Sequence, residues 1–231
     1  MSIIVAIDGP AASGKSSTSA EVARQLGWAH LDSGALYRAL TWVGLELGDP
    51  SGLDPSVILH EAERRGVALS LRGRQAVVLA GGEALDDRIR SPEVTAAVSH
   101  VAAQPAVRDW VTHRLRGLAA TAGPVVVDGR DIGTAVFPDA VVKVFLVATP
   151  EVRAGRRLSQ RGERLDPARL RLEAERIAAR DRADATRRAA PMQPAPDALV
   201  LDTSALDFQA QVAVILDLIR KRGLPQVGPG A

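Results

Sequence analysis

The chain of 231 residues has no cysteine. Disulfide bonds and thiolate metal sites are therefore excluded, and a reducing compartment is compatible with the sequence. Aromatic residues make up only 3%, so the side chains on which a nucleic-acid surface stacks bases are scarce. No apolar run approaches the roughly 20 residues of a membrane span, and the N-terminus lacks the basic segment that begins a signal peptide. We expect a cytoplasmic protein with no membrane and no nucleic acid among its partners.

Lysine is also scarce, with three lysines against 26 arginines. The formal net charge of +2 gives little reason to expect a nucleic-acid partner. Positive charge is concentrated in residues 151–188, where twelve arginines accompany seven carboxylates. The four histidines, at positions 30, 60, 100 and 113, have no metal-ligand spacing, and we interpret them as ordinary surface or partly buried residues.

The most informative stretch is GPAASGKS at residues 9–16, which fits the phosphate-binding pattern G-x-x-x-x-G-K-[ST]. An apolar, strand-like segment (3–7) precedes it, and a helix-like segment (16–26) follows. Glycines let successive N–H groups point at phosphate oxygens, and the helix N-terminus adds partial positive charge. Lys15 can reach the β- and γ-phosphates, and the Ser16 hydroxyl can bind Mg²⁺. A structural glycine turn is the alternative, but the strand–loop–helix context favours a nucleoside-triphosphate site.

Strand-like and helix-like segments alternate along the chain, which is typical of a parallel sheet covered by helices. The expected core strands are residues 3–7, 28–32, 125–127, 141–147 and 198–202. The expected helices are residues 16–26, 35–47, 92–119, 151–188 (with breaks near 162 and 166–167) and 207–222. Residues 67–71 and 76–79 predict an antiparallel hairpin, foreign to a parallel sheet and therefore an insertion. The predicted fold is α/β, with a P-loop NTPase-like parallel sheet flanked by helices and a small antiparallel insertion.

Two further motifs follow apolar strands and so fall at the carboxyl edge of the sheet, where α/β proteins bind ligands. They are DSGALYR at 32–38 and DGRD at 128–131. Each offers an arginine suited to phosphate and a carboxylate suited to donors on a base or sugar. Asp128 could also hold Mg²⁺ through water. From the residues alone, either motif fits a polar loop as well as a ligand site.

A third motif, RDRADATR at 180–187, lies in the arginine-rich region. On a helix, Arg180, Asp184 and Arg187 would line one face. Such charge runs usually form a salt-bridged, solvated face, which is the alternative interpretation. Beside a phosphate loop, the same face suits phosphoryl transfer, where positioning and charge neutralisation supply most of the catalysis.

Together these motifs resemble the bacterial cytidylate kinases, nucleoside monophosphate kinases of the P-loop class. The resemblance covers nearly the whole length, with motifs in the family's order and spacing: IDGPAASGKSS at 7–17, LDSGALYR at 31–38, IRSPEV at 89–94, SHVAAQPAVR at 99–108, DGRDIGTAVFPDA at 128–140 and RDRADATR at 180–187. The chain departs from many members at residues 11–13, where Ser-Gly-Ala is common, and at 16–17, where Gly-Thr is common. Ser16 still supplies a hydroxyl for Mg²⁺.

The resemblance implies a role for each matching residue. Catalytic residues would be Lys15, Arg130, Arg180 and Arg187. The ATP site would comprise Gly9, Pro10, Ala11, Ala12, Ser13, Gly14, Lys15, Ser16 and Ser17, with the lid residues Arg153, Arg156 and Arg157. The CMP site would comprise Asp32, Ser33, Tyr37, Arg38, Ser99, Arg108, Gly129, Arg130, Asp131, Arg180, Asp184 and Arg187. Within that set, Ser99, Arg108 and Asp131 would read the cytosine edge. Mg²⁺ would be held by Ser16 and, through water, by Asp128.

The implied reaction is phosphorylation of CMP and dCMP by Mg·ATP, by direct in-line transfer, in a monomer. A single unit (1–231) would contain a core at about 1–60, 100–150 and 185–223, a monophosphate-binding insertion at about 62–98, a short helical lid at about 151–168 and a frayed tail at 224–231. The alternatives are a P-loop kinase of another nucleoside monophosphate (UMP/CMP type) and a kinase of a small hydroxylated metabolite. A nucleotide switch is disfavoured, because the sequence has no guanine-reading Asn-Lys-x-Asp motif.

Overall fold

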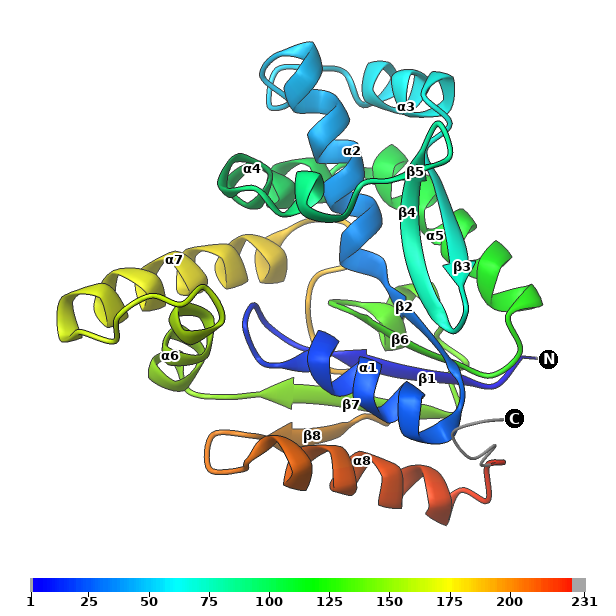
Figure 1. Ribbon diagram of the computed structural model, residues 1–231, viewed down its shortest axis with the longest axis vertical. Helices are drawn as coiled ribbons and strands as arrows, with labels where there is room; N and C mark the ends of the chain where they lie inside the picture. The colour runs from blue at the N-terminus through cyan, green and yellow to red at the C-terminus, as the bar shows by residue number, and fades with distance from the viewer. Residues whose placement is uncertain (1, 226–231) are drawn as a thin grey trace.

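An eight-stranded sheet forms the centre of residues 2–225, which this computed structural model describes (Figure 1). Most of the predicted tail, 224–231, lies outside these residues. The strands are β1 (Ile4–Asp8), β2 (Ala29–Asp32), β3 (Ala68–Arg72), β4 (Gln75–Ala80), β5 (Glu83–Ala84), β6 (Val125–Gly129), β7 (Val142–Val147) and β8 (Leu199–Asp202). Their order is β3-β4-β2-β6-β1-β7-β8, and β5 pairs with β4.

The predicted parallel core and the predicted hairpin are both present. Strands β2, β6, β1, β7 and β8 pair in parallel, and β3 pairs with β4 in antiparallel fashion. The hairpin is also attached to the parallel sheet, which the sequence did not predict. Strand β4 joins the sheet by pairing in parallel with β2 through a single register pair, His30 with Gln75.

Helices cover both faces of the sheet (Figure 1). They are α1 (Lys15–Leu26), α2 (Ser33–Leu47), α3 (Pro55–Arg64), α4 (Pro92–Ala102), α5 (Pro105–Thr121), α6 (Pro150–Gln160), α7 (Pro167–Thr186) and α8 (Phe208–Lys221), with a 3₁₀ turn at Asp86–Arg90 and a π turn at Ile132–Val136. Within residues 2–225, no helix combines the length and the apolar character that crossing a bilayer requires.

The helices differ from the prediction in two places. The predicted helix 92–119 is two helices, because Gln104 is extended and Pro105 starts α5. A residue before proline disfavours the helical conformation, whereas proline itself suits a first helical position. Helix α3 was not predicted, although it has the usual start signals: Pro55 in its first turn and an Asp54 side chain that accepts from the Ser56 N–H.

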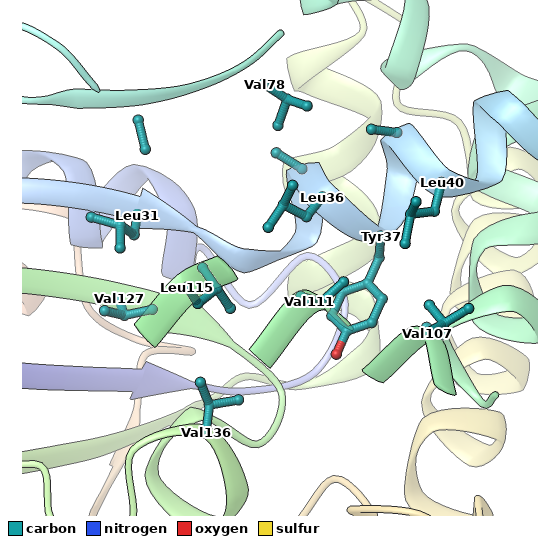
Figure 2. Close-up of a cluster of buried hydrophobic side chains, with 14 of the residues drawn as sticks. Leu31, Leu36, Tyr37, Leu40, Val78, Val107, Val111, Leu115, Val127 and Val136 are labelled. Atoms are coloured by element: carbon teal, nitrogen blue, oxygen red, sulfur yellow. The ribbon is translucent and has the colours of Figure 1, made fainter. Parts of the chain in front are cut away.

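Two apolar layers lie on opposite faces of the sheet. One contains α1 and α8, whose side chains pack on Val5, Ile7 and Val144. The other contains α2, α4 and α5, and Figure 2 shows Leu36 and Tyr37 of α2 packed near Val111 and Leu115 of α5. Strands β1 and β6 at the centre of the sheet are buried along their whole length, and they are therefore apolar until their last residues. The edge strand β8 is mostly exposed.

The α6–α7 pair projects from the carboxyl edge of the sheet (Figure 1). Its break between Gln160 and Pro167 agrees with the predicted interruptions. A small apolar cluster joins Ala154 of α6 and Ile177 of α7 to Ala11 of the phosphate loop. The two helices are therefore packed directly against the loop that the sequence identifies as the nucleotide site.

Candidate active site

The phosphate loop leaves β1 at Asp8 and enters α1 at Lys15. A Cβ at Gly9 would lie 2.4 Å from the carbonyl oxygen of Leu146 on β7, so only glycine fits where the loop passes the neighbouring strand. Gly14 has a φ of 89° and supplies the left-handed turn into the helix. The free N–H groups at the start of α1 thus face the carboxyl edge of the sheet, where they form an anion site.

Lys15 is folded back against its own loop. Its Nζ donates a hydrogen bond to the Pro10 carbonyl oxygen at 2.9 Å, and the side chain is buried. Burial lowers the pKa of Lys15 well below its ordinary value, and the positive charge of Arg130 adds to the shift. Since a carbonyl oxygen is a neutral acceptor, an anionic phosphate oxygen would be the stronger partner for this ammonium group.

The two residues predicted to hold magnesium meet at the end of the loop. Ser16 Oγ donates to Asp128 Oδ2 at 2.5 Å. Burial favours a raised pKa for Asp128, but hydrogen bonds from His30 and Ser16 outweigh it and hold the pKa below its usual range. Hydroxyl and carboxylate oxygens suit Mg²⁺, which takes few protein ligands and completes its shell with phosphate and water. No cluster of three or more metal-ligating side chains occurs in residues 2–225.

Four arginines gather beside the loop, and they differ in how well they are partnered. Arg130 donates to Asp184 at 3.0 Å, Arg157 pairs with Glu173 at 3.1 Å and Arg38 donates to Thr95 at 2.9 Å. Arg180 has no ion pair among the described residues, and its Nε is buried without a hydrogen-bond partner. Burial lowers the pKa of Arg180 to about 9, and the charges of Arg130 and Arg38 add to the shift. Because a buried, unpartnered guanidinium is costly, this position suits an anionic ligand.

A second charged group surrounds the buried carboxylate of Asp131. The Asp131 carboxylate accepts hydrogen bonds from Arg108 and, at 2.9 Å, from Arg187. The Arg108 guanidinium lies 5.5 Å from the ring centre of Tyr37, whose hydroxyl is buried without a hydrogen-bond partner. Arg108 also donates to the last carbonyl of α4, one turn after Ser99. Two donors leave about two lone-pair positions of Asp131 free to accept from a ligand.

Asp8 connects this second group to the phosphate loop. Its two oxygens accept the backbone N–H groups of Ile132 and Gly133, each at 2.8 Å. Burial raises the pKa of Asp8 to about 6, although these hydrogen bonds oppose the shift. A Cβ at Gly129 would lie 2.5 Å from Ser33 Oγ, so the loop that carries Asp131 is also confined from the α2 side.

The three predicted lid arginines have different surroundings. Arg153 is buried beneath the phosphate loop, where it donates to the Ala11 carbonyl at 3.0 Å and pairs with Asp181. The same Asp181 carboxylate accepts the Ala11 N–H at 2.8 Å. Arg156 donates to Thr203 Oγ1 at 3.0 Å and to the Ser13 carbonyl of the phosphate loop at 3.4 Å. Of the three, only Arg157 adds its charge to the arginine group.

The remaining predicted substrate residues lie at the same edge. Ser33 Oγ donates to the Asp128 carbonyl at 2.7 Å, so its hydroxyl is committed to the backbone. Asp32 is the register partner of Asp128. Burial and the charge of Asp128 raise the pKa of Asp32 above its usual value, and Arg90 lies 3.6 Å away.

Three residues that contribute to the site were missed by sequence reasoning: Asp8, His30 and Asp181. Asp8 and Asp181 lie inside the motifs that were identified, but motif matching assigned them nothing. His30 was interpreted as an ordinary histidine, yet it is buried and its Nε2 lies 2.7 Å from Asp128 Oδ1. A polar residue at an inward position of an otherwise apolar strand was the available signal.

Comparisons with known proteins agree with this geometry. The chain is 42% identical to a cytidylate kinase of Geobacillus kaustophilus, over 95% of this chain and 97% of that one. It is 45% identical to a bifunctional pantoate ligase/cytidylate kinase of a Synechococcus strain, over 98% of this chain, and spans only about half (47%) of that longer relative. An uncharacterised protein from Eubacterium ventriosum shares the fold, with a TM-score of 0.50 at 12% identity over 94% of this chain and 98% of that one. The cytidylate kinase family model matches residues 5–221, and the chain belongs to the cytidylate kinase family.

Proposed function

We propose that the chain transfers the γ-phosphoryl group of ATP to CMP and dCMP. The observation that carries this proposal is Arg180, whose Nε is buried without a hydrogen-bond partner and which forms no ion pair among the described residues. Its positive charge acts on Lys15 of the phosphate loop and adds to those of Arg130 and Arg38. A nucleotide phosphate in this position would supply the missing negative charge. Membership of the cytidylate kinase family and the similarity to the cytidylate kinase of Geobacillus kaustophilus over nearly its whole length support the same substrate.

The protein's contribution to the transfer is charge and position. The acceptor is already a phosphate oxygen anion, so no strong general base is needed. Lys15, Arg130 and Arg180 would balance the charge that spreads over the migrating phosphoryl group. Mg²⁺, held by Ser16 and through water by Asp128, would neutralise charge on the ATP phosphates when bound. Arg187 is less suited to the reacting phosphate than the resemblance implied, because it is committed to Asp131 and to the Ala190 carbonyl at 2.7 Å.

Selectivity for cytosine follows from the donors and acceptors around Asp131. Cytosine presents an amino donor beside ring acceptors, whereas uracil presents an oxygen and an N–H in those places. The free acceptor positions of Asp131 suit the amino group, and Arg108 and Ser99 suit the acceptors. A uracil oxygen facing the carboxylate would leave buried polar groups unsatisfied, and such mismatches can reduce kcat/KM by about 10⁴-fold.

Exclusion of water is the remaining requirement, because water competes as an acceptor. We assign it to closure of two segments over the substrates: the insertion at about 62–98 and the lid at about 151–168. The basic face of α6, with Arg157 toward the arginine group, supports the lid assignment. We further infer that the enzyme is a monomer and acts in the cytoplasm, which size-exclusion chromatography and cell fractionation can test.

The test is ADP formation from Mg·ATP with CMP, dCMP, UMP, AMP, GMP or no acceptor. We expect ADP chiefly with CMP and dCMP. In a second arm, Lys15→Met should reduce kcat by at least about 10²-fold, while Lys221→Met, at the exposed end of α8, should not change it. ADP with a different monophosphate would retain the catalytic loop but overturn the assigned base specificity. No ADP with any of them would overturn the substrate class and favour a hydroxylated metabolite.

A further inference from the structure

His30 is the one buried histidine of the described chain, and both of its ring nitrogens are engaged. It lies on β2, two residues before the strand ends at Asp32. Its Nε2 is 2.7 Å from Asp128 Oδ1, and its Nδ1 is 2.9 Å from Nε2 of Gln75. With the Gln75 amide as donor, Nδ1 accepts and Nε2 carries the proton that is donated to Asp128.

The carboxylate of Asp128 is thus held from two sides. His30 takes Oδ1, while Oδ2 accepts from Ser16 of the phosphate loop at 2.5 Å. The χ2 torsion of an aspartate is soft and nearly two-fold, so a single contact would leave this carboxylate free to turn. Because Oδ1 of Asp128 is hydrogen-bonded to the His30 imidazole, Oδ2 points toward the Ser16 hydroxyl.

The contacts continue outward into the hairpin. Gln75 is exposed and is the first residue of β4. The backbone carbonyl of the preceding residue, Arg74, accepts the His30 backbone N–H at 2.8 Å. The line Gln75–His30–Asp128–Ser16 therefore runs from the segment assigned to the monophosphate to the phosphate loop. Groups that hold a metal-binding carboxylate from behind fix its orientation, and their loss commonly weakens metal binding by about 10–100-fold.

We propose that His30 is a positioning residue for the magnesium-holding carboxylate. Its imidazole fixes Asp128 with Oδ2 toward Ser16, and Gln75 fixes the imidazole. The inference rests on the proposed function, because it presupposes that Ser16 and Asp128 serve a nucleotide-bound metal. The competing explanation is that His30 only satisfies a buried carboxylate and so contributes to folding alone.

The test compares the affinity of the full chain for ADP in Mg²⁺ and in EDTA, at one pH, by calorimetry. The ratio of the two dissociation constants measures how strongly the protein couples the metal to the nucleotide. We expect His30→Leu to reduce this ratio by about tenfold and to leave the metal-free affinity unchanged. His30→Gln restores an N–H donor at nearly the same reach and should keep most of the ratio. Gln75→Ala should cause a smaller loss, and His60→Leu, exposed on α3, should cause none.

A kinetic arm separates positioning from substrate binding. His30→Leu should raise the Mg²⁺ concentration for half-maximal rate while the KM for CMP stays constant. If His30→Leu lowers the unfolding midpoint and leaves the ratio at the wild-type value, the role is structural and the inference is overturned. If His30→Leu does not fold, Gln75→Ala and His30→Gln replace it, and wild-type ratios in both variants, with a lowered unfolding midpoint, overturn it. If the wild-type protein binds ADP with the same affinity in Mg²⁺ and in EDTA, the proposed metal site is refuted, and the inference with it.

Discussion

Replacement of Arg180 by methionine should stabilise the protein while nearly abolishing its activity. Burial and neighbouring charges lower the pKa of Arg180 to about 9 and so disfavour its charged form in the folded state. A pKa lowered this far corresponds to a cost of ~5 kcal/mol for the charged form. Because the side chain is only partly buried, solvent screens part of that cost, and we expect a measured gain of about 1–3 kcal/mol.

The sign follows from protonation linkage. The folded pKa lies below the unfolded one, so at pH 7 the guanidinium is charged in both states and the folded state bears the full cost. That cost would begin to fall only above about pH 9, where the folded state releases the proton first, and would vanish only near the pKa of the unfolded chain. Methionine matches the length and helix propensity of arginine and carries no charge, so it removes the cost at every pH.

The assay is urea unfolding followed by circular dichroism, with Arg182→Met as the matched control on the same helix. Arg182 is exposed, so its replacement should change stability by less than about 0.5 kcal/mol. In parallel, kcat for Arg180→Met should fall by about 10³-fold, the scale of arginines that balance a migrating phosphoryl group. A variant less stable than wild type would show that Arg180 has a counter-charge in the free protein. A variant with normal turnover would remove Arg180 from the reaction.

Three further substitutions test the supporting carboxylates. Asp131→Asn should cost about 3 kcal/mol in urea unfolding, because two buried guanidinium groups lose their counter-charge, and calorimetry should show weaker binding of CMP but not of ADP. The pKa of Asp8, raised from 3.8 to about 6, means that the folded state holds its proton longer than the unfolded state. The stability of wild type relative to Asp8→Asn should therefore fall by up to ~3 kcal/mol between pH 4 and 6.5, and a flat difference across that range would contradict the assignment. Asp181→Ala frees the Ala11 N–H and Arg153, so the KM for ATP should rise about tenfold, at roughly 1.4 kcal/mol, with little change in the KM for CMP.

Sequence reasoning reached the elements whose signals are local. The phosphate loop could be predicted because its glycines, lysine and flanking apolar strand are contiguous in the chain. The hairpin was found from its alternation and turn residues, but its attachment to β2 was not, because one register pair between distant segments leaves no local pattern. The break before Pro105 was visible in the sequence, yet the apolar periodicity on both sides masked it.

The predicted site residues met at one edge of the sheet, but their partners could not be read from the sequence. Arg153 and Arg157 are four residues apart and chemically identical. Arg153 lies under the phosphate loop and pairs with Asp181, whereas the charge of Arg157 acts on Arg180. Residues four apart share one face of a helix, so the difference comes from their positions along α6. Arg153 in the first turn reaches Asp181, and Arg157 one turn later reaches Glu173.

The partners of an arginine therefore distinguish its role better than its position in a motif does. Arg108 and Arg187 share the buried carboxylate of Asp131, and Arg153 pairs with Asp181, so all three have a carboxylate partner before any ligand arrives. They hold Asp131 and the phosphate loop in place. Arg180 lacks such a partner among the described residues, and the folded state tolerates the cost. A phosphate bound beside Arg180 would add a negative charge that the protein itself does not place there. It should therefore gain more from Arg180 than from an arginine that already has a carboxylate partner.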